Sequence, residues 1–579
     1  MTDNILINPL TIKSKTSILT VLNMEKKNVI SSFLLIALII SGVSNIIIFN
    51  NISQEDPTDF STFRRQIYSS FSSIEPLNST DSISKDVVHQ VCEGLFTYDL
   101  RDISLPRINH LAEDYFWKNQ TMLQVKVREG VLFHDGYPFN ASAVKWNLDR
   151  INYLINATRT LSSDLKLPLS ASLFFLQDGI TPIINRTVVE TELNVSIYLN
   201  SPFSPFLNLL CHQASSMLSP KSTPATRLIQ LNEDLIGTGP FIFDSCTQDD
   251  SSKEAVHFSR WDGYWRNLPH FEKMIFGTFE YFGCTYFGQC EIDWYHFINL
   301  WLDSWLPDNL KFKSFTDDTG LPKLTYQYLG FNNKVYNATW RKVMCLAFNY
   351  SNVLDVIRLG NGIRAKSPIS ASFGAAYNIS VQNSYNITKA RNIMQSMGFG
   401  TGFTTDAEWI SIAESISPFL SIPYTYNLGN QFREDLFTAV HIWFKLIGIE
   451  VQDDGVTFAE YLNYLYDDRD HLGIYSVGFV PDYLDPYNTL DKLFNPNSDL
   501  NFAQVDDPWV NSKLLLALNT PDEATRNNIY KDIQWYLTEV GCFHAPLYHP
   551  KITVLHSAKI YNTPYNALDL FEAYYMYRI

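Results

Sequence analysis

The sequence predicts an α/β fold, and three observations lead to it. Stretches typical of short strands alternate with amphipathic helices along most of the 579 residues. Apolar residues make up 46% of the chain and charged residues 18%, a composition that supports hydrophobic cores and excludes disorder or a collagen-like repeat. The apolar residues are not gathered into many long runs, which excludes a polytopic membrane protein. At roughly 150 residues per domain, length alone predicts about four units.

The acidic charge balance of the chain argues against one class of partner, nucleic acids. The chain has 44 Lys and Arg residues against 60 Asp and Glu residues, for a formal net charge of -16. Binding of nucleic acid needs clustered cations that neutralise phosphates. We therefore expect no nucleic-acid partner.

The first predicted element is a membrane helix over residues 29–49. This stretch is uncharged and follows Lys26 and Lys27. At about 1.5 Å per residue it spans about 30 Å, the thickness of a bilayer core. The lysines predict that residues 1–28 form a cytoplasmic tail and that the chain beyond Asn50 lies outside. A cleaved signal peptide is the alternative, because Gly42 and Ser44 offer small residues at a cleavage site.

A polar linker, residues 50–62, precedes the folded body. Residues 123–127 alternate apolar and polar side chains, a turn follows at Gly130, and residues 131–133 resume the alternation. This pattern predicts a β-hairpin. Asn140 is then expected to cap a helix, since apolar residues follow it at intervals of three to four.

Three further helices are predicted in the carboxyl-terminal half. Helices over 390–397 and 436–447 each stop at a glycine one residue beyond, where the left-handed conformation ends a helix. The second of these precedes a strand. The last helix opens with Thr520 as its cap and Pro521 at its first position, and its apolar stripe runs through 529–540.

Signatures of catalysis and metal binding are missing. The zinc-protease, serine-hydrolase, P-loop and EF-hand motifs do not occur. None of the seven cysteines has the spacing of a zinc or redox pair, although Cys284 and Cys290 are close enough for a local disulfide. The sequence predicts neither an enzyme nor a cofactor or metal site.

The loop over residues 478–486 is the strongest candidate site from the residues alone. It follows the apolar strand 471–477 and places Asp482 and Asp485 just beyond the strand end, where open α/β sheets bind ligands. The alternative is that each carboxylate caps its own turn, especially Asp485, which precedes a proline.

Short fragments in a fixed order run from about Ser73 to the carboxyl terminus, and the most specific is VREGVLFHDG at residues 127–136. Together they resemble the extracellular solute-binding proteins of family 5, the oligopeptide- and dipeptide-binding class that serves ABC importers. The other fragments include IEP at 74–76, CEGL at 92–95, GTGP at 237–240, EID at 291–293, YLGFN at 328–332 and DYLDP at 482–486.

The resemblance implies a two-lobed, periplasmic-binding-protein-like clamshell (type II) that closes by a hinge around its ligand. A third subdomain is inserted in the first lobe. This organisation replaces the four units that length suggests. The expected parts are lobe I at residues 63–100, 225–290 and 545–579, the inserted subdomain at 101–224, and lobe II at 291–544.

The resemblance also implies site residues. A carboxylate at the position of Asp482 pairs with the α-ammonium group of a peptide, which otherwise loses its hydration without compensation. The backbone at Gly478 and Val480 bonds an extended peptide as an added strand does. Phe479 provides an apolar wall where many relatives carry Trp, and Ser82 lies on the opposing side of the cleft.

The implied function is a receptor with a single membrane span and a large extracytoplasmic part. It captures peptides outside the cell and delivers them to the permease subunits of an ABC importer. Binding of an oligosaccharide or another solute is the alternative on the same fold, as is a surface sensor without transport. Residues 472–481 hold no basic side chain for a peptide carboxylate, so ligand length is not predicted. No lipid-attachment cysteine follows the apolar run, since the first is Cys92.

Overall fold

The computed structural model describes residues 61–67, 71–160, 167–248, 254–278, 292–295, 310–381 and 384–579. All of them belong to one compact unit, Ser61–Ile579. The predicted tail, the membrane helix over 29–49, nearly all of the linker and the Cys284–Cys290 disulfide lie outside these residues. Within the described part of the chain, no helix is both long and apolar enough to cross a bilayer.

A seven-stranded sheet in the order β12-β19-β11-β1-β10-β9-β8 forms one half of the unit. β1 runs parallel to its neighbours β10 and β11, and the remaining pairs are antiparallel. Helix α2 (Ser82–Val91) packs its apolar face into the core of this sheet, and the Asp81 carboxylate caps it. The strands are β1 (Thr62–Gln66), β8 (Phe241–Gln248), β9 (Glu254–Arg260), β10 (Lys273–Gly277), β11 (Trp294–Tyr295), β12 (Leu310–Ser314) and β19 (Thr553–Ser557).

A four-stranded antiparallel sheet in the order β4-β5-β7-β6 lies wholly within residues 101–224. Its strands are β4 (Ala112–Asn119), β5 (Met122–Val127), β6 (Ile184–Val189) and β7 (Asn194–Leu199), and α3 (Ala141–Thr160) packs on β6 and β7. Asn140 caps α3 as predicted, since its Oδ1 accepts from the Ala143 amide at 3.0 Å.

The predicted hairpin is only half correct. The strand over residues 123–127 is β5, but its hairpin partner is the preceding strand β4, and residues 131–133 make only an isolated antiparallel bridge, from Leu132 to Pro138. β4 exposes most of its side chains to solvent, so its sequence carries little apolar alternation to mark it as a strand.

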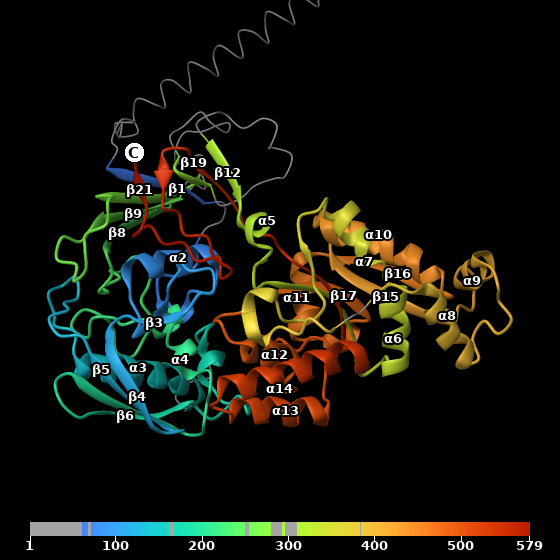
Figure 1. Cartoon of the computed structure of the whole chain (residues 1–579), viewed down its shortest axis with the longest axis horizontal. Coiled ribbons are helices and arrows are strands. Elements are labelled where there is room, and N and C mark those ends of the chain that lie inside the picture. Colours follow the sequence, from blue (N-terminus) through green and yellow to red (C-terminus); the bar gives the residue numbers. More distant parts are fainter. Residues whose placement is uncertain are drawn as a thin grey trace, which may run out of the picture. The chain divides into compact units, whose positions relative to one another are not determined.

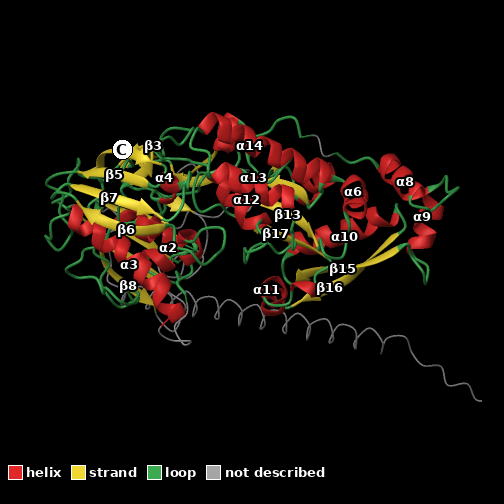
Figure 2. Ribbon diagram, turned by 90° about the horizontal axis from the view of Figure 1, so that it is seen from below, coloured by secondary structure: helices red, strands yellow, loops and turns green. Residues whose placement is uncertain are grey.

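A six-stranded sheet in the order β14-β18-β13-β17-β15-β16 forms the other half. β15, β16 and β17 are mutually parallel where they pair, and β13 runs antiparallel to β17 and β18. Helix α10 (Gln431–Lys445) packs on β15 and β16 (Figure 2). The strands are β13 (Tyr326–Phe331), β14 (Ile363–Arg364), β15 (Leu420–Asn427), β16 (Ile449–Val456), β17 (Ile474–Phe479) and β18 (His544–His549).

Helices surround this sheet, and α12, α13 and α14 form a group of neighbouring helices (Figure 1). α8 (Ile387–Ser396) and α10 confirm two of the predicted helices. Gly398 and Gly448, which follow them, have φ angles of 91° and 74°. The other helices are α4 (Phe206–Leu209), α5 (Phe315–Thr319), α6 (Ala338–Ala347), α7 (Tyr350–Asn352), α9 (Asp406–Ala413), α11 (Phe458–Tyr466), α12 (Pro486–Phe494), α13 (Pro508–Leu518) and α14 (Glu523–Trp535).

The predicted start of the last helix is wrong by two residues. Asp522 caps α14 by accepting from the Thr525 amide at 2.8 Å, whereas the Thr520 hydroxyl donates to Leu516 of the preceding helix. Two cap residues of similar quality stand close together here, and the contact with α13 decides between them.

Two short segments join the large sheets. Residues 315–325 lead from β12 to β13, and residues 550–552 lead from β18 to β19. They are bonded to each other, because the Lys323 amide donates to the Pro550 carbonyl at 2.9 Å and the Ile552 amide to Thr316 Oγ1 at 2.8 Å. Such paired connectors are suited to a hinge.

The lobe boundaries at residues 291 and 545 stay predictions. The seven-stranded sheet takes in β11 and β12, and the six-stranded sheet takes in β18.

One hydrophobic cluster continues from the four-stranded sheet into α12, α13 and α14. Phe203 packs edge-on against Tyr487 with ring centroids 5.8 Å apart. The Ser204 hydroxyl donates to the Leu518 carbonyl at 2.8 Å. The four-stranded sheet is therefore joined to the helices of the six-stranded half by both apolar and polar contacts.

Candidate ligand-binding site

The candidate site begins at the carboxyl end of β17, as the sequence predicts. β17 pairs with β13 along its full length but with β15 only at Ile474 and Tyr475. On the β15 side, residues 476–479 have no strand partner in the described part of the chain. A hydroxyl from α11 occupies one position there, since Tyr461 donates to the Ser476 carbonyl at 2.7 Å. The other positions of this edge have no strand partner among the described residues.

Asp482 lies in the loop between β17 and α12 and is half-buried. Its amide donates to Asn488 Oδ1 at 2.9 Å, and Asn488 Nδ2 donates to Asp482 Oδ2 at 3.3 Å. No Lys, Arg or His forms an ion pair with this carboxylate among the residues the structure describes. The side chain is thus held in place while its charge remains uncompensated, which suits a carboxylate that awaits a cationic ligand group.

The other predicted residues occupy different environments. Gly478 is exposed, and a Cβ atom there would lie 2.2 Å from the Gln327 amide nitrogen, so the neighbouring strand uses the space that a side chain would take. Val480 is 54% exposed, whereas Phe479 is 7% exposed and belongs to the hydrophobic core. Ser82 is the exposed first residue of α2.

His212 is a neighbour of Asp482 that the sequence analysis missed. Its ring is 4% exposed, and Nδ1 accepts from the Ala214 amide at 3.2 Å. The proton of the neutral ring is therefore on Nε2, a buried atom without a hydrogen-bond partner among the described residues. Burial lowers the pKa of His212 to about 3. The positive charge of Lys85 also lowers this pKa, whereas the negative charge of Asp482 raises it.

The charges that act on His212 come from two other segments of the chain. Lys85 lies one turn beyond Ser82 on α2, His212 follows α4, and Asp482 follows β17. Nothing in the local pattern distinguishes His212 from the other eleven histidines, so no sequence signal identifies it. Its relevance arises only where the segments meet.

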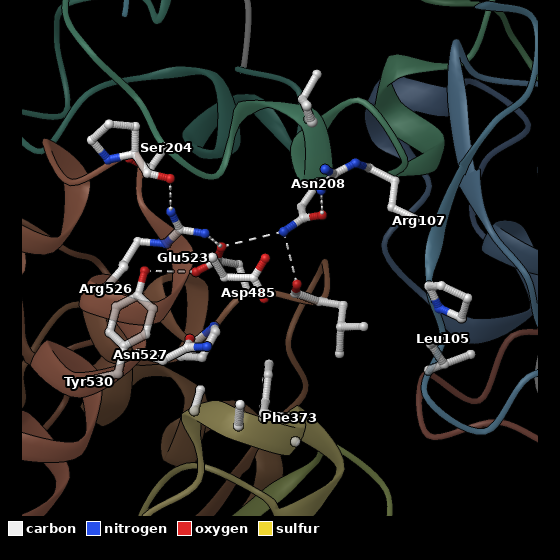
Figure 3. Close-up of a pocket in the computed structure, with 18 of the residues that line it drawn as sticks. Leu105, Arg107, Ser204, Asn208, Phe373, Asp485, Glu523, Arg526, Asn527 and Tyr530 are labelled. Atoms are coloured by element: carbon white, nitrogen blue, oxygen red, sulfur yellow. Dashed lines mark hydrogen bonds and ion pairs between the residues drawn. The ribbon is translucent and has the colours of Figure 1, made fainter.

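A cavity of about 900 Å³ lies close by. One set of lining residues comes from segments 98–107, 117–120 and 202–208, and the other from 371–376, 484–486 and 519–530 (Figure 3). None of the five predicted ligand-binding residues lines it. Leu484 and Asp485 do, and they belong to the same loop as Asp482.

Asp485 is the central polar group of this cavity. It caps α12 by accepting from the Tyr487 amide at 2.9 Å, and it accepts from the Tyr530 hydroxyl at 2.8 Å and from Asn208 at 3.3 Å. Arg526 approaches it to 3.9 Å (Figure 3). Burial raises the pKa of this carboxyl and Arg526 lowers it. The sequence alternative, that Asp485 caps its own turn, is therefore confirmed.

In the described residues, no three His, Cys, Asp or Glu side chains are grouped as metal ligands are. The polar groups around Asp482 and in the cavity are hydrogen-bond and charge partners. We find no nucleophile paired with a base among them. The arrangement is chemically suited to binding.

Comparisons with known proteins agree with this geometry. The glutathione-binding protein GsiB of Pectobacterium atrosepticum is 26% identical over 495 residues, which cover 80% of this chain and 84% of that protein. The fold matches the periplasmic binding protein DppA of Helicobacter pylori, in complex with the peptide STSA, with a TM-score of 0.68 at 18% identity over 89% of this chain and 97% of that one.

It also matches a dipeptide-binding protein from a Pseudoalteromonas species, in complex with Met-Leu, with a TM-score of 0.69 at 17% identity over 90% of this chain and 100% of that one. The α/β binding-protein fold predicted from the sequence is confirmed. The family model for the middle part of the bacterial extracellular solute-binding proteins of family 5 matches residues 108–501. Since this match covers well over half of the chain, the chain belongs to family 5 of the extracellular solute-binding proteins.

Proposed function

We propose that this protein is the extracytoplasmic receptor of an ABC importer and that it captures short peptides. The observation that carries the proposal is Asp482, a half-buried carboxylate that is held by Asn488 and has no cation partner among the described residues. It stands at the end of a strand whose edge is partly open. One peptide ligand can satisfy both features, because its α-ammonium group can pair with Asp482 while its extended backbone bonds the edge of β17.

His212 adds a third point of recognition. Its Nε2–H is buried without a partner in the described part of the chain, and a buried donor left unsatisfied costs about 1–3 kcal/mol. A ligand carbonyl or carboxylate oxygen next to the ammonium group satisfies it. The positive charge of Lys85 acts on His212 and favours an anionic group on the ligand.

The cavity provides room for more of the ligand. Its volume of about 900 Å³ lies within the range of roughly 300–1,000 Å³ that is usual for small-molecule sites. We assign to it the ligand groups that lie beyond the residue bound at Asp482. The glutathione and peptide ligands in the names of the similar proteins have this general chemistry.

The remaining parts of the proposal concern the cell. The apolar stretch over residues 29–49 serves as a membrane anchor, and the permease subunits of the importer receive the loaded receptor. The paired connectors at 315–325 and 550–552 act as the hinge on which the two halves close.

A thermal-shift assay tests this function. A soluble form that begins at Gln54 keeps the whole unit Ser61–Ile579. A ligand that binds only the folded state raises the midpoint of unfolding, because it stabilises by RT ln(1 + [L]/Kd), about 2.7 kcal/mol at a hundredfold excess over Kd. We expect shifts with di- to tetrapeptides and with glutathione, and none with a panel of oligosaccharides.

The opposite pattern overturns the assignment. A shift with oligosaccharides and none with peptides would establish the sugar-binding alternative. A peptide shift without any interaction between the receptor and permease subunits in reconstituted vesicles would support a surface sensor instead of a transport protein.

A further inference from the structure

Two cysteines that are far apart in sequence meet inside the six-stranded half of the protein. Cys345 lies on α6, one turn after Arg341. Arg341 Nη2 donates to the Gly541 carbonyl at 2.8 Å, and the Cys345 thiol donates to the His544 carbonyl at 3.8 Å. Cys542 lies between these two attachment points. The face of α6 that carries Cys345 therefore packs against the segment that carries Cys542.

Both sulfur atoms are buried in the same hydrophobic core. Cys345 is 1% exposed and Cys542 is fully buried. The Cys542 thiol donates to the Thr538 carbonyl at 3.3 Å, and each of the two thiols influences the pKa of the other. Cys542 has a φ angle of 46°, an uncommon conformation for a side chain with a Cβ atom.

The environment polarises the pair. The Cys345 thiol holds the pKa of Cys542 below its usual value, with help from Lys342 and Arg341 and against the effect of burial. Burial raises the pKa of Cys345. Cys542 is thus the sulfur with more thiolate character, which is the nucleophile in disulfide exchange.

We propose that Cys345 and Cys542 form a disulfide bond in the exported protein. The other described thiols, at Cys92, Cys211 and Cys246, have carbonyl, tyrosine or carboxylate neighbours and no cysteine among their interaction partners. Disulfides persist outside the cytoplasm. The inference rests on the extracytoplasmic location in the proposed function and not on the ligand.

The oxidant is a small-molecule disulfide such as oxidised glutathione. The Cys542 thiolate attacks one of its sulfur atoms, and the other half leaves as a thiolate that takes up a proton. Cys345 then loses its proton and attacks the Cys542 sulfur, which releases the second half as a thiol. The two cysteines lose two electrons and two protons, and the small disulfide is reduced to two thiols. Because both sulfurs are buried once α6 docks, the oxidant reacts with Cys542 before docking, when Cys542 has the ordinary reactivity of an exposed thiol.

The bond links α6 to the chain that enters β18. β18 pairs with both β13 and β14, so the link joins a helix on the face of the sheet to one of its inner strands. A disulfide that closes a long loop restricts the unfolded chain strongly. We expect the oxidised protein to unfold at a midpoint several degrees above that of the reduced protein.

The experiment uses the full chain, refolded with oxidised and reduced glutathione or with dithiothreitol alone. Free thiols are alkylated in denaturant, and proteolytic peptides are identified by mass spectrometry without reduction. We expect a linked peptide pair that contains Cys345 and Cys542 after oxidative refolding and none in dithiothreitol. Alkylation of both cysteines in the oxidised sample would overturn the proposal. This measurement uses the wild-type protein, so it does not depend on whether a variant folds.

Variants test the consequence for stability. Cys345→Ala and Cys542→Ala should each reduce the difference in unfolding midpoint between oxidising and reducing conditions by the same amount, and the double variant should reduce it no further. Cys92→Ala is the matched control, a buried thiol without a cysteine neighbour, and should keep the difference. A difference in Cys345→Ala as large as that of the wild type contradicts the bond. If no peptide ligand binds but the disulfide-linked Cys345–Cys542 fragment is found, the ligand assignment is rejected and the disulfide proposal stands.

Discussion

Asp482→Asn separates a ligand-binding role from a structural role for this carboxylate. The substitution removes the charge but retains an oxygen that can accept from Asn488, which now bonds Asp482 at 3.3 Å. Because Asp482 is half-buried, an effective dielectric constant near 20 applies, and an ion pair at 4 Å gains about 4 kcal/mol. Desolvation of the ammonium group offsets part of this gain, and the amide oxygen retains a neutral hydrogen bond.

The expected net loss is about 2–3 kcal/mol, which corresponds to a 30- to 150-fold weaker Kd. Isothermal titration calorimetry at pH 7 measures it with a free-amine dipeptide that shifts the wild-type midpoint. The same peptide with an acetylated amino terminus lacks the charge that Asp482 recognises, so its affinity should be the same in both proteins. Asp470→Asn, at a surface carboxylate that is 78% exposed, is the control and should bind as the wild type does.

Two results would refute the reasoning. An equal loss for the free and acetylated peptides assigns Asp482 to the structure of its loop. Unchanged binding of the free-amine peptide places the ammonium group elsewhere. A circular dichroism melt of the variant distinguishes either result from misfolding.

Two further predictions concern stability. Arg150→Met leaves the Glu75 carboxylate buried without its bidentate partner, which now bonds it at 2.7 and 3.1 Å, and should lower the free energy of unfolding in urea by about 3–5 kcal/mol. The double variant with Glu75→Gln should regain part of this loss, and a single variant as stable as the wild type contradicts the argument. Burial lowers the pKa of His544 to about 3 and of His549 to about 4, below the value of about 6.5 in the unfolded chain. Their stabilisation is complete above pH 6.5 and is lost as the pH falls toward 4, because the unfolded state binds protons first. The unfolding midpoint should therefore decline from pH 7 to pH 5, less steeply in His544→Gln, and a flat profile in the wild type opposes this account.

Local sequence was a good guide where an element is set by its own residues. α8 and α10 were predicted from apolar periodicity and from the glycine that follows each helix, and both are present. β17 and the position of Asp482 beyond its end were also predicted. In these cases the signal lies within a few residues, because side chains three to four apart share a helix face and alternate ones share a strand face.

Predictions failed where the outcome depends on a contact with a distant segment. The hairpin partner of β5 is β4, whose exposed face leaves little apolar alternation. The role of Phe479 as a wall of the cleft stays a prediction, and the sequence does not indicate that its side chain belongs to a hydrophobic core. Its burial depends on the layer of residues packed over β17, which no local pattern records.

The candidate site shows the same division. The sequence identified the loop that carries Asp482, and the ordered family fragments predicted its chemistry. His212 was not identified, because a single histidine after a short helix has no distinguishing pattern and matters only where α2, α4 and the Asp482 loop come together.

By itself, the sequence determined the α/β class, the strong helices and the family, and it predicted Asp482 as the carboxylate for a peptide ammonium group. Those features follow from periodicity, composition and ordered motifs along the chain. Only the tertiary structure decided that β17 has an open edge, that Asp485 is tied to Tyr530 and Asn208, and that Cys345 meets Cys542. Each of these depends on the distance between segments that are remote in sequence, and that distance is set by how the sheets and helices pack.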